Sequence, residues 1–286
     1  MIVAVAAISF AAIFFRGAAP TSPLATAGWR LAFAAILLTP WIYRVHRAGR
    51  LPSRVWGWGV VAGLAYAVHF GAWVASLELT RVAASVTLVT ASPLLLAIVG
   101  ALSGRDRPSR RLWLALGVAA AGMLIVGWRD LFPTDHLTPD ALLGDALALL
   151  GAVAIAGYLL VVRRLGDQLD ALAFTGIAAG VGAVTLLATA LVTGTGALPA
   201  TWEATGFIAL AALIPQLIGH TTLTWALRHV SPTMVGIATL GEPVGATALA
   251  WWLLDESVDA VTIVGCAVVL AGVALAVALP SADASA

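Results

Sequence analysis

Lysine is absent from this chain of 286 residues, and all fifteen of its basic residues are arginine. Without lysine the chain has no Walker A phosphate loop and cannot form a Schiff base with retinal or pyridoxal phosphate. Cysteine occurs only once, as Cys266, which excludes intrachain disulfides and cysteine-ligated iron–sulfur clusters. We therefore expect a protein that uses neither ATP nor a cofactor.

Charged residues are also scarce, at 10% of the chain, whereas soluble domains average about 25%. Apolar residues make up 61%, against about 45–50% in soluble domains, and the mean hydropathy is +1.01. They stand in long uninterrupted runs, not in alternation with polar residues, which argues against an outer-membrane barrel. The composition predicts an all-α polytopic membrane protein whose surroundings are the lipid bilayer and which has no nucleic-acid partner.

Ten apolar runs approach the roughly 20 residues that a helix needs to cross a bilayer. Short loops that are charged or contain glycine and proline separate them. We predict ten transmembrane helices, over residues 1–19, 24–43, 56–79, 82–102, 112–128, 143–162, 171–193, 204–227, 232–254 and 261–279. A signal peptide is the alternative for the first run, but the basic segment and cleavage site of a signal peptide are missing.

The arginines predict the orientation, because cytoplasmic loops of membrane proteins carry an excess of basic residues. With the N-terminus inside, eleven arginines, Arg105 and Arg107 among them, fall in cytoplasmic loops, and only three fall outside. The opposite orientation would invert this bias, so we expect both termini in the cytoplasm. Arginine without lysine is typical of GC-rich codon usage, which favours a bacterial inner-membrane protein.

The two halves of the chain share features at a spacing of 150 residues. This shift aligns, in the same order, Leu77 with Leu227, Pro93 with Pro243, and Ala121 and Gly122 with Ala271 and Gly272. The halves, residues 1–129 and 142–279, each hold five predicted spans, so the second half enters the membrane upside down. Two inverted five-helix repeats are typical of secondary transporters, which bind substrate between the halves near mid-membrane.

Ionisable groups are costly at membrane depth and are functional candidates by default. Four fall near the middle of predicted spans: Arg30, His69, His220 and Glu242. His69 shares one helix face with Tyr66, Trp73 and Ser76, and His220 lies on a second stripe with Gln216 and Thr224. We predict that these stripes line one cavity for an amphipathic small-molecule substrate; packing between helices is the alternative.

Glu242 is the only acidic residue deep in a predicted span. It would carry a proton or bind a substrate amine, or else support the helix interruption that Pro243 causes. Arg30 would bind a substrate carboxylate or act as a fixed structural cation. Two histidines without a third ligand at usable spacing do not predict a metal site.

Other features favour structural interpretations. Arg16 is interpreted as a residue whose side chain extends to the membrane interface; the alternative is that it controls access at the outer opening of the transport path. Tyr158 is interpreted as an interfacial residue, with a position at the cavity as the alternative. Two glycine-rich runs, residues 176–182 and 265–272, are interpreted as close-packing surfaces, as are Ser85 and Ser92.

Several segments resemble the ten-helix EamA branch of the drug/metabolite transporter superfamily. They are His69-Phe-Gly-Ala-Trp-Val-Ala-Ser-Leu77, Val86-Thr-Leu-Val-Thr-Ala-Ser-Pro93, Pro215-Gln-Leu-Ile-Gly-His220, Trp225-Ala-Leu-Arg228 and Leu240-Gly-Glu-Pro243. The resemblance covers essentially the whole chain as two tandem repeats, and it implies ATP-independent export of amino acids, other small metabolites or amphipathic compounds. The chain departs from the pattern in its first span, which lacks a Trp-Gly pair, and at Pro93, which follows serine and not glutamate.

Other classes fit the sequence less well. An intramembrane enzyme would need a Gly-x-Ser-x-Gly or Gly-x-Gly-Asp stretch or a pair of carboxylates, so we expect no enzyme. A sugar-phosphate or nucleotide-sugar exchanger would need several basic groups at mid-membrane, where only Arg30 is available. A passive channel would not need an inverted repeat. Substrate identity, proton coupling against facilitated diffusion, and oligomeric state stay open.

Overall fold

The computed structural model describes residues 1–103, 109–131, 139–166, 170–230 and 232–278. Helices dominate, and no strand occurs within these ranges. The helices before the middle of the chain are α1 (Ile2–Ser9), α2 (Ala11–Gly17), α3 (Pro23–Arg47), α4 (Ser53–Leu79), α5 (Val82–Val89), α6 (Ser92–Ser103) and α7 (Arg110–Leu131). Arg105 and Arg107, which entered the prediction of orientation, lie outside the described residues.

The later helices are α8 (Pro139–Leu165), α9 (Ala171–Thr193), α10 (Trp202–Ala211), the π-helix η2 (Ala212–His220), α11 (Thr221–Ala226), α12 (Pro232–Thr239), α13 (Glu242–Leu253) and α14 (Ala260–Ala278). Six stretches are long and apolar enough to cross a membrane: Pro23–Arg47, Ser53–Leu79, Val82–Ser103, Asp140–Leu165, Ala171–Thr193 and Trp202–Ala226. Two shorter apolar helices are Ile2–Gly17 and Ala260–Ala276. The all-helical class is established, and the count of ten spans stays a prediction.

Four predicted spans are not single regular α-helices. The first, fourth and ninth are each interrupted, between α1 and α2, between α5 and α6, and between α12 and α13, and the eighth contains η2. Pro93 and Pro243 are the second residues of α6 and α13, and proline has no N–H to continue the hydrogen bonds of the preceding turn. At the end of α5, Thr90 donates its hydroxyl back to the carbonyls of Val86 (2.8 Å) and Thr87 (3.0 Å).

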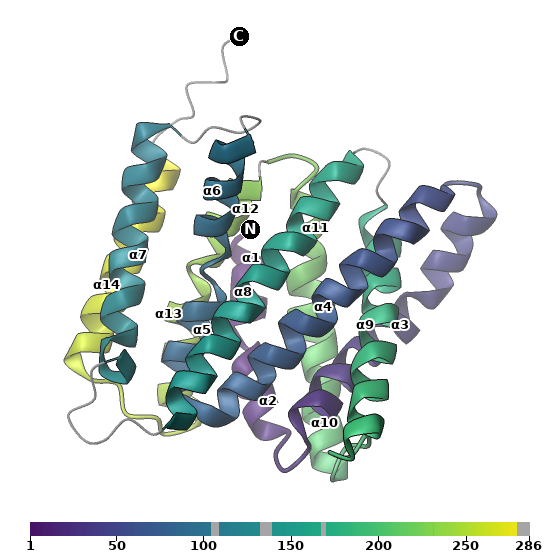
Figure 1. The fold of residues 1–286 in the computed structure, drawn as a ribbon, viewed down its shortest axis with the longest axis horizontal. Coiled ribbons are helices and arrows are strands. Elements are labelled where there is room, and N and C mark those ends of the chain that lie inside the picture. Colours follow the sequence, from purple (N-terminus) through teal and green to yellow (C-terminus); the bar gives the residue numbers. More distant parts are fainter. Residues whose placement is uncertain (104–108, 132–138, 167–169, 231, 279–286) are drawn as a thin grey trace.

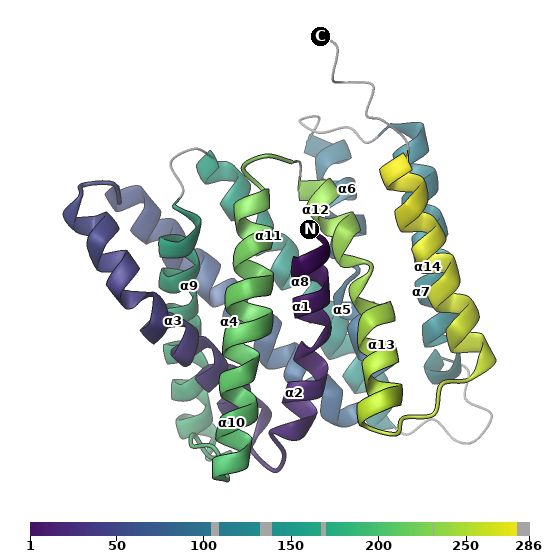
Figure 2. The ribbon, with the colours of Figure 1, turned by 180° about the vertical axis from the view of Figure 1, so that it is seen from behind.

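The helices form a row, with α3 and α9 at one end and the pair α7–α14 at the other (Figures 1 and 2). Helix α4 packs against α8 and α9, and α3 packs against α9, so these four helices make one bundle. The interrupted helices lie between this bundle and the α7–α14 pair. Residues from opposite halves of the chain thus pack against each other throughout the molecule.

Helices α7 and α14 approach each other closely through small residues. A Cβ atom at Gly122 would lie 2.6 Å from the backbone nitrogen of Val269, and one at Gly272 would lie 2.7 Å from that of Ala119. Such contacts are shorter than side chains tolerate, so only glycine allows this approach. The interpretation of residues 265–272 as a packing surface is confirmed.

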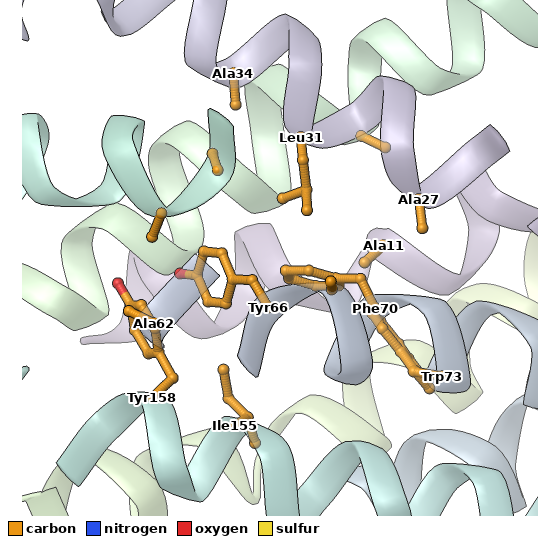
Figure 3. Close-up of a cluster of buried hydrophobic side chains, with 14 of the residues drawn as sticks. Ala11, Ala27, Leu31, Ala34, Ala62, Tyr66, Phe70, Trp73, Ile155 and Tyr158 are labelled. Carbon is orange, nitrogen blue, oxygen red and sulfur yellow. The ribbon is translucent and has the colours of Figure 1, made fainter. Parts of the chain in front are cut away.

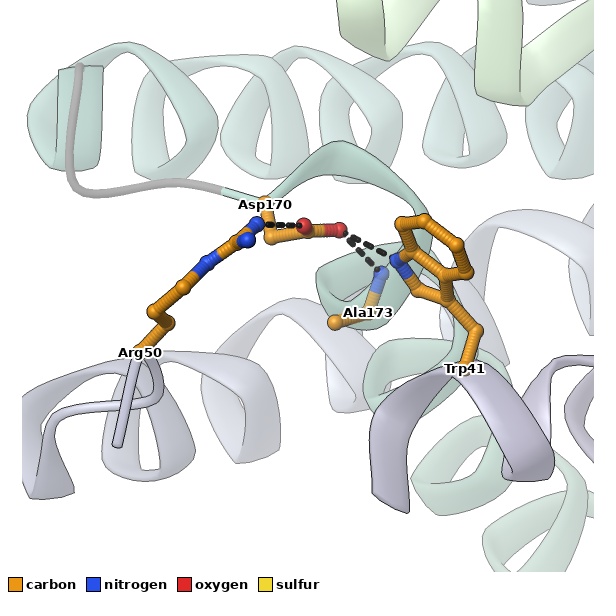
Figure 4. A network of polar contacts seen from close by, with 4 residues as sticks. All are labelled: Trp41, Arg50, Asp170 and Ala173. Atoms are coloured by element: carbon orange, nitrogen blue, oxygen red, sulfur yellow. Dashed lines mark hydrogen bonds and ion pairs between the residues drawn. The ribbon is translucent and has the colours of Figure 1, made fainter. Parts of the chain in front are cut away.

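A polar network fixes the end of the four-helix bundle where α9 begins (Figure 4). Asp170 caps α9 by accepting the backbone N–H of Ala173 at 3.1 Å, and it also accepts the indole N–H of Trp41 at 2.9 Å. Arg50, in the loop after α3, forms an ion pair with the same carboxylate at 3.2 Å. The network ties the α3–α4 connection to the start of α9.

Apolar side chains cover the outward surface of the helices. Many large aliphatic and aromatic side chains are exposed, for example Leu102, Val192 and Trp252. A surface of this kind would aggregate in water but is solvated by lipid tails. The exposed side chains therefore fit a multi-pass protein embedded in a membrane.

Candidate binding cavity

A cavity of about 50 Å³ lies among the interrupted helices. Both halves of the chain contribute polar and aromatic side chains to its wall, including His69, Trp73, Tyr158, His220, Thr224 and Glu242. Apolar side chains such as Ile155 and Leu223 complete the lining. The cavity therefore combines hydrogen-bonding groups with apolar surface, as sites for small amphipathic molecules do.

The size of the cavity limits what it holds in this conformation. One water occupies about 30 Å³ of liquid, and pockets for drug-sized ligands measure about 300–1,000 Å³. At about 50 Å³ the cavity lies well below that range in this conformation.

The two histidines from the two halves meet at the cavity, with ring centroids 6.4 Å apart. The Nδ1 of His69 lies 2.8 Å from the carbonyl oxygen of Gly151 in α8, and this nitrogen donates because a carbonyl only accepts. In the neutral ring, the Nε2 of His69 is consequently an acceptor. The ring of Trp73 stacks beside His69 at 6.0 Å.

Aromatic residues of α4 and α8 form the adjoining wall (Figure 3). Tyr66 is fully buried behind the cavity and stacks on Tyr158 with ring centroids 4.2 Å apart. The hydroxyl of Tyr158 lies 3.0 Å from that of Thr224, which fixes both groups at the cavity. Tyr158 is 1% exposed, so its interpretation as an interfacial residue was wrong.

Arg30 lies next to the cavity but is not part of its lining. Its side chain is fully buried, and it donates from Nη2 to the Oε1 of Gln216 at 3.0 Å. The guanidinium carbon lies 4.1 Å from the ring centroid of Phe70 and 5.1 Å from that of Phe15. Arg30 and Gln216 thus form one buried unit behind Phe70.

Not every member of the predicted stripes reaches the cavity. The hydroxyl of Ser76 lies 2.6 Å from that of Ser85 in α5 and also donates to the carbonyl of Trp73 at 2.7 Å. Ser76 therefore joins α4 to α5 and does not line the cavity. Ser92, which we assigned to packing, lies at the cavity with Thr90 and Thr239. The prolines at the helix interruptions, Pro93 and Pro243, are the sequence feature that could have predicted this position.

Glu242 is the first residue of α13 and lies in the cavity wall, 7% exposed. Among the described residues, no basic side chain lies within salt-bridge distance of its carboxyl group. The position at an interrupted helix places an acidic group at the interface between the two halves. Within the same part of the chain, no three side chains from His, Cys, Asp and Glu come close enough to hold a metal ion.

A polar cluster joins the two halves at the end of the molecule where α2, α4 and α13 finish. Arg16 donates from Nη2 to the carbonyl oxygen of Thr80 at 3.0 Å and lies 3.4 Å from the carboxylate of Glu256. Just above it, the rings of Phe15 and Trp73 pack edge to face at 5.4 Å. We call Arg16, Thr80 and Glu256 the end latch.

These features define a class: a polytopic helical membrane protein with a polar cavity between two halves of its chain. The sequence model of the EamA-like transporter family matches residues 1–128 and again residues 142–278. The chain belongs to the EamA-like transporter family, within the drug/metabolite transporter superfamily. Members of this family are membrane transporters and not enzymes.

The fold has counterparts among solved structures. One crystal structure of another protein matches with a TM-score of 0.74 and 18% sequence identity, covering 96% of this chain and 94% of that chain. At this identity the likeness concerns the fold alone. A comparison with curated proteins finds no match.

Proposed function

We propose that the protein is a secondary transporter that exports small metabolites, such as amino acids or amphipathic compounds, from the bacterial cytoplasm. The proposal includes ten membrane spans in two inverted five-helix repeats, residues 1–129 and 142–279, with both termini in the cytoplasm. The observation that carries it is the cavity, which both halves line at their helix interruptions. The two separate matches of the family model agree with two repeats.

The packing pattern supports the inverted repeat. In the proposed repeat, α3 corresponds to α9 and α7 to α14, and each of these pairs is in direct contact. The contact of α4 with α8 has a counterpart in the contact of η2 with α1. Equivalent helices thus make equivalent contacts across the two halves, as an internal pseudo-twofold axis in the membrane plane requires.

Transport follows from two arrangements of the halves around the cavity. Here the end latch joins the halves on one side, which the orientation assigns to the outside. Breaking the latch while the opposite side closes would move the cavity from one face of the membrane to the other. Glu242 would couple this change to a proton or a substrate amine, because it lies at the interface that rearranges.

Growth of bacteria that express the chain tests the proposal. Cells would be challenged with toxic amino acids, their analogues and lipophilic cations, and intracellular accumulation would be measured in parallel. Export predicts resistance to at least one class together with lower accumulation of that compound. The same growth and accumulation measurements on Glu242→Gln provide the matched comparison, because this variant preserves the shape of the side chain but cannot ionise. Unchanged sensitivity and accumulation across all classes, with the protein present in the membrane, would refute export of these compounds.

A further inference from the structure

Buried hydrogen-bond donors without acceptors gather on one side of the cavity. They include the Nε and Nη1 atoms of Arg30, the amide Nε2 of its neighbour Gln216 and the indole Nε1 of Trp73, none of which has a partner within the described ranges. Arg30 is 0% exposed and Trp73 is 2% exposed. Buried polar groups almost always find a partner, so these unsatisfied donors need a physical explanation.

Two phenylalanine rings bring these donors together. The guanidinium carbon of Arg30 lies 5.1 Å from the ring centroid of Phe15 and 4.1 Å from that of Phe70. The ring of Trp73 lies 5.4 Å and 6.4 Å from the same two rings. Since Trp73 lines the cavity, the cluster forms part of the cavity wall and of the layer directly behind it.

Among the described residues Arg30 has no direct ion-pair partner, and Glu242 attracts its charge only from beyond salt-bridge distance. In the described part of the chain no carboxylate lies within salt-bridge distance of its guanidinium, and its one hydrogen bond goes to the neutral amide of Gln216. The two ring faces attract the cation, but such contacts recover only part of the free energy lost when a cation leaves water. An anionic group would supply both the missing charge and the missing acceptors.

We propose that Arg30 and Trp73 form a subsite for the carboxylate of the transported molecule. A carboxylate has two acceptor oxygens with about four lone-pair positions, enough for the free donors of Arg30 and Trp73, and its bonds to a guanidinium are charge-assisted. This inference rests on the proposed transport function and narrows the substrates to small molecules that carry a carboxylate. Glu242, contributed by α13, lies on the cavity wall and would receive a positively charged group of the same molecule.

The subsite becomes reachable as the cavity enlarges. The ring of Phe70 covers the guanidinium and also packs 5.4 Å from the ring of His220, so it lies between Arg30 and the cavity. Separation of the helices that admits a metabolite would free this ring to turn aside. The carboxylate then replaces the aromatic face as the neighbour of the guanidinium.

Release from reconstituted vesicles tests this assignment. Vesicles would be loaded with an equimolar mixture of the twenty protein amino acids and their carboxamides, which differ only in the carboxylate. Release of each compound would be followed by mass spectrometry, after subtraction of the release from protein-free vesicles. The unmodified protein would be compared with Arg30→Gln and Trp73→Phe. Arg50→Gln serves as a control, because it removes an exposed arginine far from the cavity.

We expect the unmodified protein and Arg50→Gln to release acids in preference to their own amides. Arg30→Gln should lower that preference roughly tenfold to a hundredfold, as expected for loss of charge-assisted hydrogen bonds, and Trp73→Phe about threefold to tenfold. If Arg30→Gln does not fold, as judged by size-exclusion chromatography, the acid-over-amide preference of Trp73→Phe tests the subsite instead. This variant keeps an aromatic ring and removes the N–H.

Two outcomes overturn the subsite while leaving transport intact: release of amides without preference for acids, or an unchanged preference in both variants. The second result would mean that Arg30 is a fixed structural cation. Vesicles that release neither series contradict the proposed function for this group of compounds, and the subsite falls with it.

Discussion

Replacing Arg16 by glutamine should open the end latch. The ion pair with Glu256 spans 3.4 Å, and the two side chains are 35% and 24% exposed, so solvent screens it and we assign it about 0.2–1 kcal/mol. The hydrogen bond to the carbonyl of Thr80 adds about 0.5–1.5 kcal/mol. Together they favour the closed side by about 1–2 kcal/mol, which corresponds to a roughly fivefold to thirtyfold change in the open population.

Cysteine labelling in intact cells measures this shift. Ala250 in α13 is 2% exposed, and a cysteine at this position changes the side chain little. In a Cys266→Ser background, Ala250→Cys should react with a membrane-impermeant maleimide roughly five to thirty times faster when Arg16→Gln is added. Glu256→Gln removes only the ion pair and should have a smaller effect.

The control is Arg50→Gln, which breaks the ion pair with Asp170 at the opposite end of the molecule and should leave the labelling rate unchanged. Equal rates for Ala250→Cys with and without Arg16→Gln would refute the reasoning. In that case the latch would contribute nothing to closure, and the packing of Phe15 on Trp73 would close this side alone.

Four further outcomes are expected. Glu242→Gln should abolish accumulation driven by a pH gradient in vesicles while downhill exchange continues; full gradient-driven uptake would show that the residue only supports the helix interruption. Trp73→Ala should slow transport at least tenfold with normal membrane insertion, since it removes both an aromatic wall and an N–H; normal transport would leave it a packing residue. Gly122→Leu should lower the free energy of unfolding by about 1–3 kcal/mol in thermal or denaturant assays, or separate α7 from α14, because its Cβ would meet the backbone of Val269. Asp170→Ala should cost about 0.5–2 kcal/mol through loss of the α9 cap, and an unchanged melting temperature would count against that role.

Regular helices were the part of the fold that hydropathy predicted best. The span 171–193 has the same ends in the structure, where Asp170 caps the first turn and Gly194 ends the helix with φ of 70°. These two residue types act locally, so their effect is visible in the sequence. The end of α3 at Arg47 and the start of α4 at Ser53 were predicted at residues 43 and 56, because polar and charged residues extend both helices beyond the apolar runs.

The interruptions were harder to predict, because hydropathy does not change across them. Pro93, Pro215 and Pro243 marked three of the four places, but a proline alone does not tell whether a helix bends, breaks or forms a π-helix. The outcome depends on which neighbouring groups satisfy the carbonyls that the proline leaves without a donor. Those neighbours are known only once the fold is known.

The candidate cavity was predictable in outline and not in detail. Helical periodicity placed His69 and Trp73 on one face, and the repeat related that face to the one with His220. The stripe runs over eleven residues, from Tyr66 to Ser76, and Ser76 at its end bonds to a different helix instead of lining the cavity. For Tyr158 the interfacial interpretation was preferred to the cavity alternative because of its place along the span, while its actual partners come from α4 and α11.

The pairing of α7 with α14 has a consequence for biosynthesis. Residues 110–131 leave the ribosome long before residues 260–278, yet the glycine surface of each helix is completed only by the other. Helix α7 is therefore inserted into the bilayer before its partner exists, and its small-residue face contacts lipid until α14 has been translated. The same holds for α3, whose partner α9 is made more than a hundred residues later. A chain truncated before α14 would leave α7 as an unpaired helix for membrane quality control to recognise.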